Sequence, residues 1–231
     1  MLSKKFLNKL MGKKTVSVDI KQFIRDVKIE TLVEIGMHFG LDTVEFRKMH
    51  PNARIVSFEP DPRNIQMIKQ LGNDKHCELY ELAASNTNEP MDFYLSSGIH
   101  PPIPSPNPLW TENEWSASSS LKAPTGHLIQ HKWVTFPSKV KVNCTRLDDF
   151  VPLKNTKIDF MWVDVQGAED LVFSSAQETL KNTHYVYTEY SNEEMYERQL
   201  NLRGVLGLFP GFKVLHDFGG DILLENMNFV K

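Results

Sequence analysis

The sequence is poor in several features that would assign it to a common class. It contains only two cysteines, Cys77 and Cys144, which are too few for a disulfide framework and lack the spacing of metal ligands. We expect both thiols to be free in a reducing, cytoplasmic compartment. No apolar run reaches 18 residues, so no segment is expected to span a membrane. The net charge of −3 gives no electrostatic reason to expect nucleic acid as a partner.

Two signatures of nicotinamide-binding enzymes are also missing. The sequence has no G-x-G-x-x-G turn and no Tyr-x-x-x-Lys pair, which removes the commonest short-chain dehydrogenase chemistry. What is present fits one globular domain, because 231 residues with 41% hydrophobic content can bury a sizeable core. We predict a single domain over residues 16–231, preceded by a basic tail over residues 1–15.

The first 14 residues combine lysines with apolar residues at helical spacing. A secretory signal would need a longer apolar core. One interpretation is a short amphipathic helix that makes weak contact with an anionic membrane surface. The other is a solvated basic tail, or a helix packed on the domain.

The most informative stretch runs from an apolar strand at Thr31 to Glu59 and Pro60. Between them lie an acidic glycine turn over residues 34–40, a helix and a second strand. A glycine turn of this kind lets backbone approach a ligand, and an acid after the next strand can hold the hydroxyls of a ribose. Glu59 follows Gly36 at close to the expected spacing of about 20 residues. We therefore predict a nucleoside-binding half of an open, doubly wound α/β sheet.

The composition of the turn indicates a cationic ligand. Its glycines are Gly36 and Gly40, and Glu34 precedes them. A carboxylate there repels a pyrophosphate but pairs with S-adenosylmethionine, which carries a sulfonium, an ammonium and a ribose. His38 stands where a third glycine would be expected, and histidine is among the residues that tolerate a positive φ. The simpler alternative is a strand-turn-helix unit without a ligand.

The next strand is predicted over residues 77–84. Its carboxyl end, Ala83-Ala84-Ser85, should lie beside the crevice in which an adenine would rest. Small side chains leave room for a flat base, although they also pack well in a core. We predict Ala84 and Ser85 as neighbours of the adenine.

Secondary-structure signals are weak over residues 96–138. The segment holds five prolines between residues 101 and 108, and it also contains Trp110, Trp115 and His131. A loop of this length in a compact domain is usually functional or disordered, and its aromatic content argues against disorder. We interpret it as a lid or substrate-recognition insertion; a surface decoration is the alternative.

Two acids follow predicted buried strands. Asp164 ends the apolar run over residues 158–163, and Glu189 follows the run over residues 185–188. Strand ends of this kind line the crevice of open α/β sheets, so Asp164 is the best catalytic candidate. It can also cap the following helix. Two neighbouring carboxylates can hold a cation, orient a hydroxyl or act as a base.

The carboxyl end contains two further β-like runs, over residues 212–218 and 222–230, joined by Gly219-Gly220-Asp221. This pattern predicts a hairpin. A terminal antiparallel strand inserted into an otherwise parallel sheet is typical of class I methyltransferases.

These motifs together resemble the FkbM-type methyltransferases, which are class I S-adenosylmethionine-dependent enzymes, over about residues 30–215. The family pattern D-x-G-A-N-x-G is similar to residues 34–40, with Glu for Asp, Met37 for Ala and His38 for Asn. The matching segments are residues 58–60 for F-E-P, 119–121 for a serine pair with leucine, 147–150 for L-D-x-F and 164–169 for D-V-x-G-A-E. The last motif, D-V-Q-G-A-E, matches without departure.

The resemblance implies a seven-stranded, mostly parallel sheet with an antiparallel carboxyl-terminal strand. It also implies an S-adenosylmethionine-dependent O-methyltransferase acting on a small-molecule, sugar or glycan hydroxyl, although the residues themselves do not choose between oxygen and nitrogen. The predicted cofactor-binding residues are Glu34, Gly36, His38, Gly40, Glu59, Pro60, Ala84, Ser85 and Asp164.

For catalysis we predict that Asp164 and Glu189 orient the hydroxyl and that His131 accepts its proton. No third carboxylate is evident at a neighbouring strand end, which favours catalysis without a metal. The alternative function is a non-catalytic module on the same fold that binds S-adenosylmethionine or a partner. The sequence does not indicate an oligomeric state.

Overall fold

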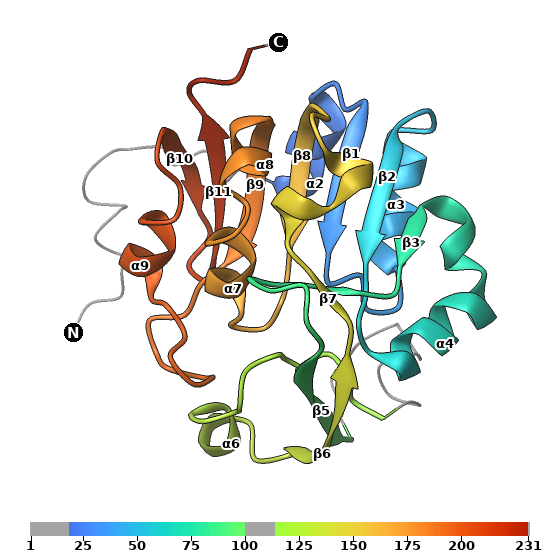
Figure 1. The fold of residues 1–231 in the computed structure, drawn as a ribbon, viewed down its shortest axis with the longest axis vertical. Helices are drawn as coiled ribbons and strands as arrows, with labels where there is room; N and C mark the ends of the chain where they lie inside the picture. The colour runs from blue at the N-terminus through green and yellow to red at the C-terminus, as the bar shows by residue number, and fades with distance from the viewer. Residues whose placement is uncertain (1–18, 100–113, 231) are drawn as a thin grey trace.

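The computed structural model describes residues 19–99 and 114–230, so the predicted tail and part of the insertion lie outside it. Its centre is a seven-stranded sheet with the order β10-β11-β9-β8-β1-β2-β3 (Figure 1). The strands are β1 Thr31–Ile35, β2 Arg54–Phe58, β3 Glu78–Tyr80, β8 Ile158–Val163, β9 Thr183–Glu189, β10 Phe212–Asp217 and β11 Asp221–Asn226. The strands from β3 across to β9 are parallel.

The carboxyl-terminal hairpin inserts one reversed strand into this sheet. β11 runs antiparallel both to β9 and to β10. The predicted seven-stranded α/β fold, with its antiparallel terminal strand, is confirmed. The hairpin also brings the amino end of β11 to the same edge as the carboxyl end of β9.

Helices cover both faces of the sheet because neighbouring residues of each strand point to opposite sides. Leu32 and Phe160 pack with Ile24 of α2 and Phe46 of α3. Val33 and its neighbours pack with α7, α8 and α9 on the opposite face. The helices are α2 Ile20–Asp26, α3 Leu41–Met49, α4 Pro62–Leu71, α6 His127–Gln130, α7 Glu169–Phe173, α8 Gln177–Lys181 and α9 Leu202–Leu206.

Short elements and caps complete the described chain. The 3-10 turns are η1 Asn73–His76, η2 Leu147–Asp149 and η3 Val151–Leu153. α4 is capped at both ends: the Asp61 side chain accepts from the Arg63 N–H at its start, and Gly72 ends it with φ 73°. In the described ranges, no helix is long and apolar enough to cross a bilayer.

The prediction of one strand over residues 77–84 is wrong. Cys77 ends η1, β3 stops at Tyr80, and the Leu82 N–H turns back to the Tyr80 carbonyl at 2.9 Å. Ala83–Ala84 then forms β4, which pairs with β7 (Cys144–Thr145) in a separate two-stranded sheet. A tight turn therefore moves the chain from one sheet to another within the predicted strand.

The segment over residues 96–138 contains more regular structure than its sequence indicates. β5 (Met91–Gly98) and β6 (Val134–Val142) form an antiparallel ribbon whose register shifts near Pro137, where a ladder hydrogen bond cannot form. Figure 1 shows the ribbon and α6 beyond the ends toward which β1 and β2 point. The described part of the insertion therefore lies over the carboxyl edge of the sheet.

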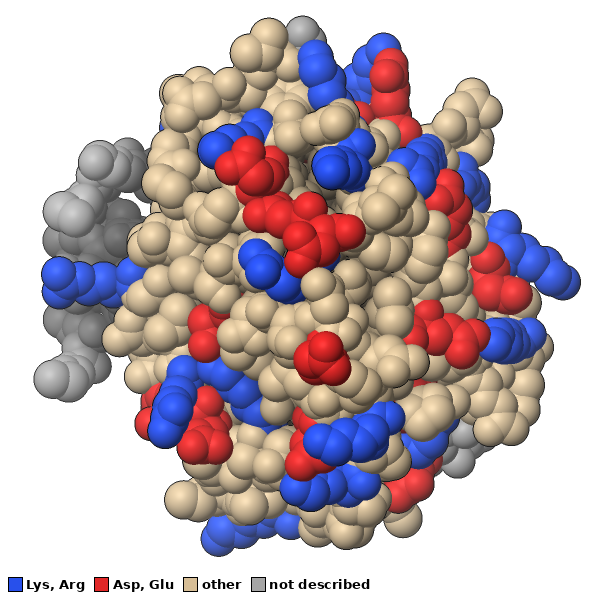
Figure 2. Space-filling view, viewed as in Figure 1, with Lys and Arg blue, Asp and Glu red and all other residues tan. Residues whose placement is uncertain are grey.

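The visible surface carries charges of both signs. Figure 2 shows lysines, arginines and acids interspersed over this face. Ion pairs of the described chain include that of Arg54 with Glu78, at 2.8 Å.

Candidate functional site

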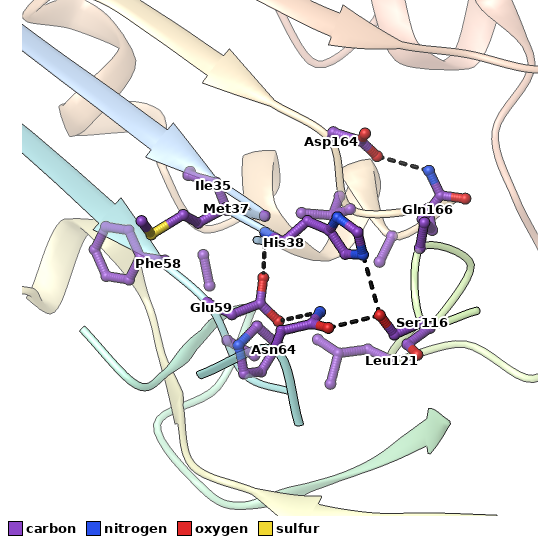
Figure 3. A pocket seen from close by; sticks show the side chains of 18 of the residues that line it. Ile35, Met37, His38, Phe58, Glu59, Asn64, Ser116, Leu121, Asp164 and Gln166 are labelled. Atoms are coloured by element: carbon purple, nitrogen blue, oxygen red, sulfur yellow. Dashed lines mark hydrogen bonds between the residues drawn. The ribbon is translucent and has the colours of Figure 1, made fainter. Parts of the chain in front are cut away.

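A cavity of about 410 Å³ lies at the carboxyl ends of β1, β2 and β8. We call it the first cavity; Figure 3 shows part of its wall. Among the predicted cofactor-binding residues, those that line it are Glu34, Gly36, His38, Glu59, Pro60, Ala84 and Asp164.

The turn after β1 needs left-handed backbone at three positions. Gly36 has φ 90°, His38 has φ 51° and Gly40 has φ 75°. The left-handed position predicted for His38 is confirmed. At Gly36 the close neighbour is protein, because a Cβ there would lie 1.8 Å from the carbonyl oxygen of Asp164. Gly36 therefore lets β1 and β8 meet, which in turn places Asp164 at the cavity.

Glu34 is buried at the end of β1 and accepts two hydroxyl hydrogen bonds on Oε2. The donors are Thr43 Oγ1 at 2.6 Å and Ser57 Oγ at 2.7 Å. Burial is the main reason that the pKa of Glu34 rises to about 8, although the two hydroxyls oppose the shift. A cation in the first cavity would favour the ionised carboxylate of Glu34.

Glu59 is held by three donors at the end of β2. Its Oε2 accepts from the His38 N–H at 2.7 Å, and its Oε1 accepts from the Asp61 N–H at 2.9 Å and from Asn64 Nδ2 at 3.1 Å. Burial raises the pKa of Glu59 to about 8. A carboxylate offers about four acceptor positions, so one remains for a ligand hydroxyl.

The His38 side chain closes a ring of hydrogen bonds with this group, as Figure 3 shows. Its Nε2 lies 3.0 Å from Ser116 Oγ, and Ser116 donates to Asn64 Oδ1 at 2.6 Å. Because the hydroxyl hydrogen of Ser116 goes to Asn64, His38 Nε2 is the donor of the first bond. Burial lowers the pKa of His38 to about 4, so the imidazole is neutral. The ring ties the insertion to the turn after β1.

Two of the predicted cofactor residues take other positions. Gly40 begins α3 with a left-handed backbone, and a Cβ there would approach Met37 Cε to 2.4 Å. Ser85 is buried, and its hydroxyl lies 3.1 Å from Met91 Sδ. Neither residue belongs to the cavity wall. Gly40 shapes the turn, and Ser85 packs behind Ala84.

The insertion supplies part of the first cavity. Trp115, Ser116 and Leu121 line it, together with the three residues from 117 to 119. Two hydrogen bonds hold the side chain of Ser119 in place: its hydroxyl donates to Asp61 Oδ2 at 3.1 Å and accepts from the Ser96 N–H at 3.0 Å. Sequence reasoning noted the serine pair only through the family pattern and placed the insertion over the acceptor.

A second cavity of about 490 Å³ adjoins the first. The two share Trp115, Ser118 and Gln166. Glu189 and His131 line the second cavity, while Asp164 lines the first. The three predicted catalytic residues are therefore divided between two adjoining cavities.

Gln166 connects the two acids. Its Nε2 donates to Asp164 Oδ1 at 2.6 Å and to Glu189 Oε2 at 3.3 Å. Gln166 has φ 51°, a strained value for a residue other than glycine, which is typical of functional sites. Burial is the main cause of the raised pKa values of Asp164 and Glu189; the charge of Asp164 raises the pKa of Glu189 further. One amide thus bridges carboxyls that resist simultaneous ionisation.

A third carboxyl, Asp221, was missed, and the prediction that none lies at a neighbouring strand end is wrong. Asp221 begins β11 and pairs in register with Glu189 at the end of β9. It also lines the second cavity. Asp221 stands at the start of its strand, and the sequence does not show that this strand runs antiparallel to its neighbours. Only that reversal places the start of β11 beside the carboxyl ends of the parallel strands. Within residues 19–99 and 114–230, no three His, Cys, Asp or Glu residues are arranged to hold a metal ion.

Comparison with known proteins identifies the family. The model of the methyltransferase FkbM domain matches residues 34–229. The chain belongs to the FkbM methyltransferase family. Its methyl donor is therefore S-adenosylmethionine, as the turn after β1 predicts.

Two curated relatives and one solved structure show the range of similarity. The 2-O-methyltransferase NoeI of Sinorhizobium fredii is 37% identical over 201 residues, which are 84% of this chain and 79% of that protein. Methyltransferase 1 of Beauveria bassiana is 25% identical over 146 residues, or 60% of this chain and 55% of that protein. A putative O-methyltransferase from Klebsiella pneumoniae, known from its crystal structure, is 13% identical with a TM-score of 0.48, covering 95% of this chain and 86% of that one.

The first cavity fits the donor of an FkbM methyltransferase. Glu34 and Asp164 offer carboxyl oxygens to a cation, Glu59 retains an acceptor position for a hydroxyl, and Ala84 leaves an apolar wall. These features favour a ligand-binding turn over a strand-turn-helix unit without a ligand. Burial is the main cause of the raised pKa values of Glu34 and Asp164, and a cation beside these carboxyls would favour their ionised forms.

Proposed function

We propose that this methyltransferase transfers a methyl group to a hydroxyl oxygen of a small molecule or carbohydrate. The observation that carries the proposal is the pair of adjoining cavities, with Asp164 on one side of Gln166 and Glu189 on the other. The name of the 2-O-methyltransferase relative supports oxygen as the acceptor atom.

The proposed contacts in the first cavity follow its chemistry. Glu34 and Asp164 face the cationic part of the donor, Glu59 accepts from a ribose hydroxyl, and Pro60 and Ala84 border the base. S-adenosylmethionine supplies an electrophilic methyl group on a sulfonium. The chain contributes alignment and the exclusion of water.

Where the two cavities adjoin, Asp164 of the first and Glu189 of the second orient the acceptor hydroxyl, and His131 accepts its proton. Glu189 and His131 both border the second cavity, and Gln166 holds Glu189 at a fixed position relative to Asp164. A base within hydrogen-bond reach is needed because an alcohol holds its proton tightly at neutral pH.

We further propose that residues 16–231 act as one domain in a reducing compartment, where Cys77 and Cys144 remain free. No interaction with nucleic acid is required by this function. The weak membrane contact proposed for residues 1–14 concerns residues outside the described ranges.

The test is methyl transfer from radiolabelled S-adenosylmethionine to a panel of methyl glycosides, simple alcohols and phenols. Asp164→Asn and His131→Asn should each lose most of the turnover while still binding donor in a calorimetric titration. Glu178→Gln, at an exposed position on α8, is the matched control. Donor binding without transfer to any hydroxyl would favour the non-catalytic module. Loss of activity with a chelator and its return with magnesium would contradict the histidine-base scheme.

A further inference from the structure

The second cavity is lined by acids and histidines but by no described lysine or arginine. Glu189 and Asp221 line it together with His127 and His131, and neither lysine nor arginine is among its lining residues in the described chain. Building on the proposed function, we propose that this cavity selects an uncharged or cationic acceptor and rejects anionic ones, with Asp221 as the residue that determines this specificity.

Two positive charges of neighbouring segments, on Lys122 and Arg198, are engaged elsewhere. Lys122 Nζ lies 2.7 Å from Asp170 Oδ1 and donates to the Arg198 carbonyl at 3.0 Å. The Arg198 side chain is 89% exposed and lies beside Glu197. His127 lines the cavity, but burial lowers its pKa to about 4, so it contributes no positive charge at neutral pH. An anionic acceptor would therefore find no lysine or arginine on the described wall, and His131, the other imidazole there, must be unprotonated to accept the hydroxyl proton in the proposed scheme.

The acids occupy one edge of the sheet. Asp221 pairs with Glu189 across β11 and β9, and Gln166 connects Glu189 to Asp164. Each of these carboxyls has a raised pKa, mainly because of burial. Charges on neighbouring side chains interact strongly in a partly desolvated site. Another negative charge would add to the repulsion, whereas an ammonium group would relieve it.

The remaining wall suits an uncharged ring. The Trp115 and Trp133 rings meet edge to face with centroids 5.0 Å apart, and Tyr190 and Tyr196 also line the cavity. Aromatic walls with a few polar groups bury apolar faces and pair with hydroxyls at their edges. The cavity thus favours a ring-shaped polyol that lacks carboxylate, sulfate or phosphate.

A first experiment compares three acceptors of one shape: methyl glucoside, methyl glucuronide and methyl 6-amino-6-deoxyglucoside. We expect kcat/KM for the glucuronide to be at least about tenfold below that for the glucoside, and the amino sugar to be as good or better. Asp221→Asn should reduce the ratio of kcat/KM for the glucoside to kcat/KM for the glucuronide severalfold. Glu197→Gln, which removes an exposed charge, should leave this ratio unchanged. Equal use of the glucuronide and the glucoside by the wild type would overturn the inference.

A second experiment does not depend on turnover. Trp133 borders the cavity, so the difference between the wild type and Trp133→Phe isolates its fluorescence. With each ion's quenching constant divided by its value for free N-acetyltryptophanamide, caesium should quench this fluorescence at least twice as strongly as iodide, and Asp221→Asn should raise the quenching by iodide. Equal normalised quenching by both ions would overturn the charge selection. Quenching that favours caesium, with no methyl transfer to any of the three sugars, would support charge selection but reject a sugar as the acceptor in the proposed function.

Discussion

Gly36 and Asp164 meet so closely that a Cβ on Gly36 would lie 1.8 Å from the Asp164 carbonyl oxygen. The contact joins the end of β1 to the end of β8, where the Asp164 N–H also donates to the Ile35 carbonyl at 2.9 Å. Asp164 is thus positioned by backbone contacts, and the absence of a side chain at Gly36 is a structural requirement.

Gly36→Ala should therefore destabilise the fold itself. The matched control is Gly219→Ala, because Gly219 has φ 92° but a Cβ added there would meet no atom within 4 Å. We expect Gly219→Ala to cost about 1–2 kcal/mol of unfolding free energy from backbone strain alone. Gly36→Ala should cost at least about 4 kcal/mol, in the range where single substitutions are exceptional. Urea denaturation measures the unfolding free energy of both variants. Equal losses of unfolding free energy would show that β8 can shift away from a Cβ at position 36 without an energetic cost.

Glu59→Gln should weaken binding of the donor. The amide loses the negative charge and places an N–H where Glu59 now accepts from backbone or Asn64. We expect a loss of about 1–3 kcal/mol in binding free energy by calorimetry. Glu78→Gln changes an exposed ion pair at the start of β3 and should leave the affinity unchanged. An unaltered affinity in the Glu59 variant would reject its role at the ribose.

The hydrogen-bond ring through His38 predicts coupling between the turn and the insertion. Ser116→Ala and His38→Asn should each weaken donor binding by about 0.5–1.5 kcal/mol, the typical net value of one hydrogen bond. Asn tolerates the left-handed backbone, but its side chain is shorter than that of histidine. Because both changes break the same bond, the double variant should lose less than the sum. Strict additivity would contradict the ring, and Ser138→Ala on β6 is the exposed control.

Donor binding should strengthen as pH rises from 6 to 8. The pKa of Glu34 in the free protein is raised to about 8, so below that pH the carboxyl carries a proton. A cation favours the ionised form, and binding must then release this proton, at a cost that grows as pH falls. Calorimetry in buffers of different ionisation enthalpy measures the release. Glu34→Gln should reduce the proton release and flatten the pH dependence, and an unchanged slope would assign the release to another group.

The local turns were predictable from sequence because their chemistry is local. Glycine at 36 and 40 with histidine at 38 indicates left-handed backbone whatever surrounds it, and D-V-Q-G-A-E marks the end of β8. The prediction of one strand over residues 77–84 was wrong because an apolar pattern does not show that its first half joins the main sheet and its second half a separate one. The full length of the β5 and β6 ribbon was not predicted because proline usually interrupts a strand. Pro137 is compatible with β6 only because the register shifts there.

The second cavity could not be assembled from sequence for a related reason. Asp221 and Glu189 are brought together by strand reversal, and Trp115 reaches both cavities through contacts made by a long insertion. None of these placements follows from the spacing of residues along the chain. The family pattern located Asp164 and Glu189 but gave no information about the wall opposite them.

The hydrogen bond from Tyr196 Oη to the Ser118 carbonyl, at 2.8 Å, joins residues 78 positions apart. Backbone bonds from Thr125 to Met195 and from Glu197 to Ala123 close the same seam between the insertion and the loop after β9. The described lining of the first cavity ends at Ala168, whereas the second cavity also needs Tyr196 and Asp221. During synthesis, the second cavity therefore cannot be completed until the chain has been made as far as the carboxyl-terminal hairpin.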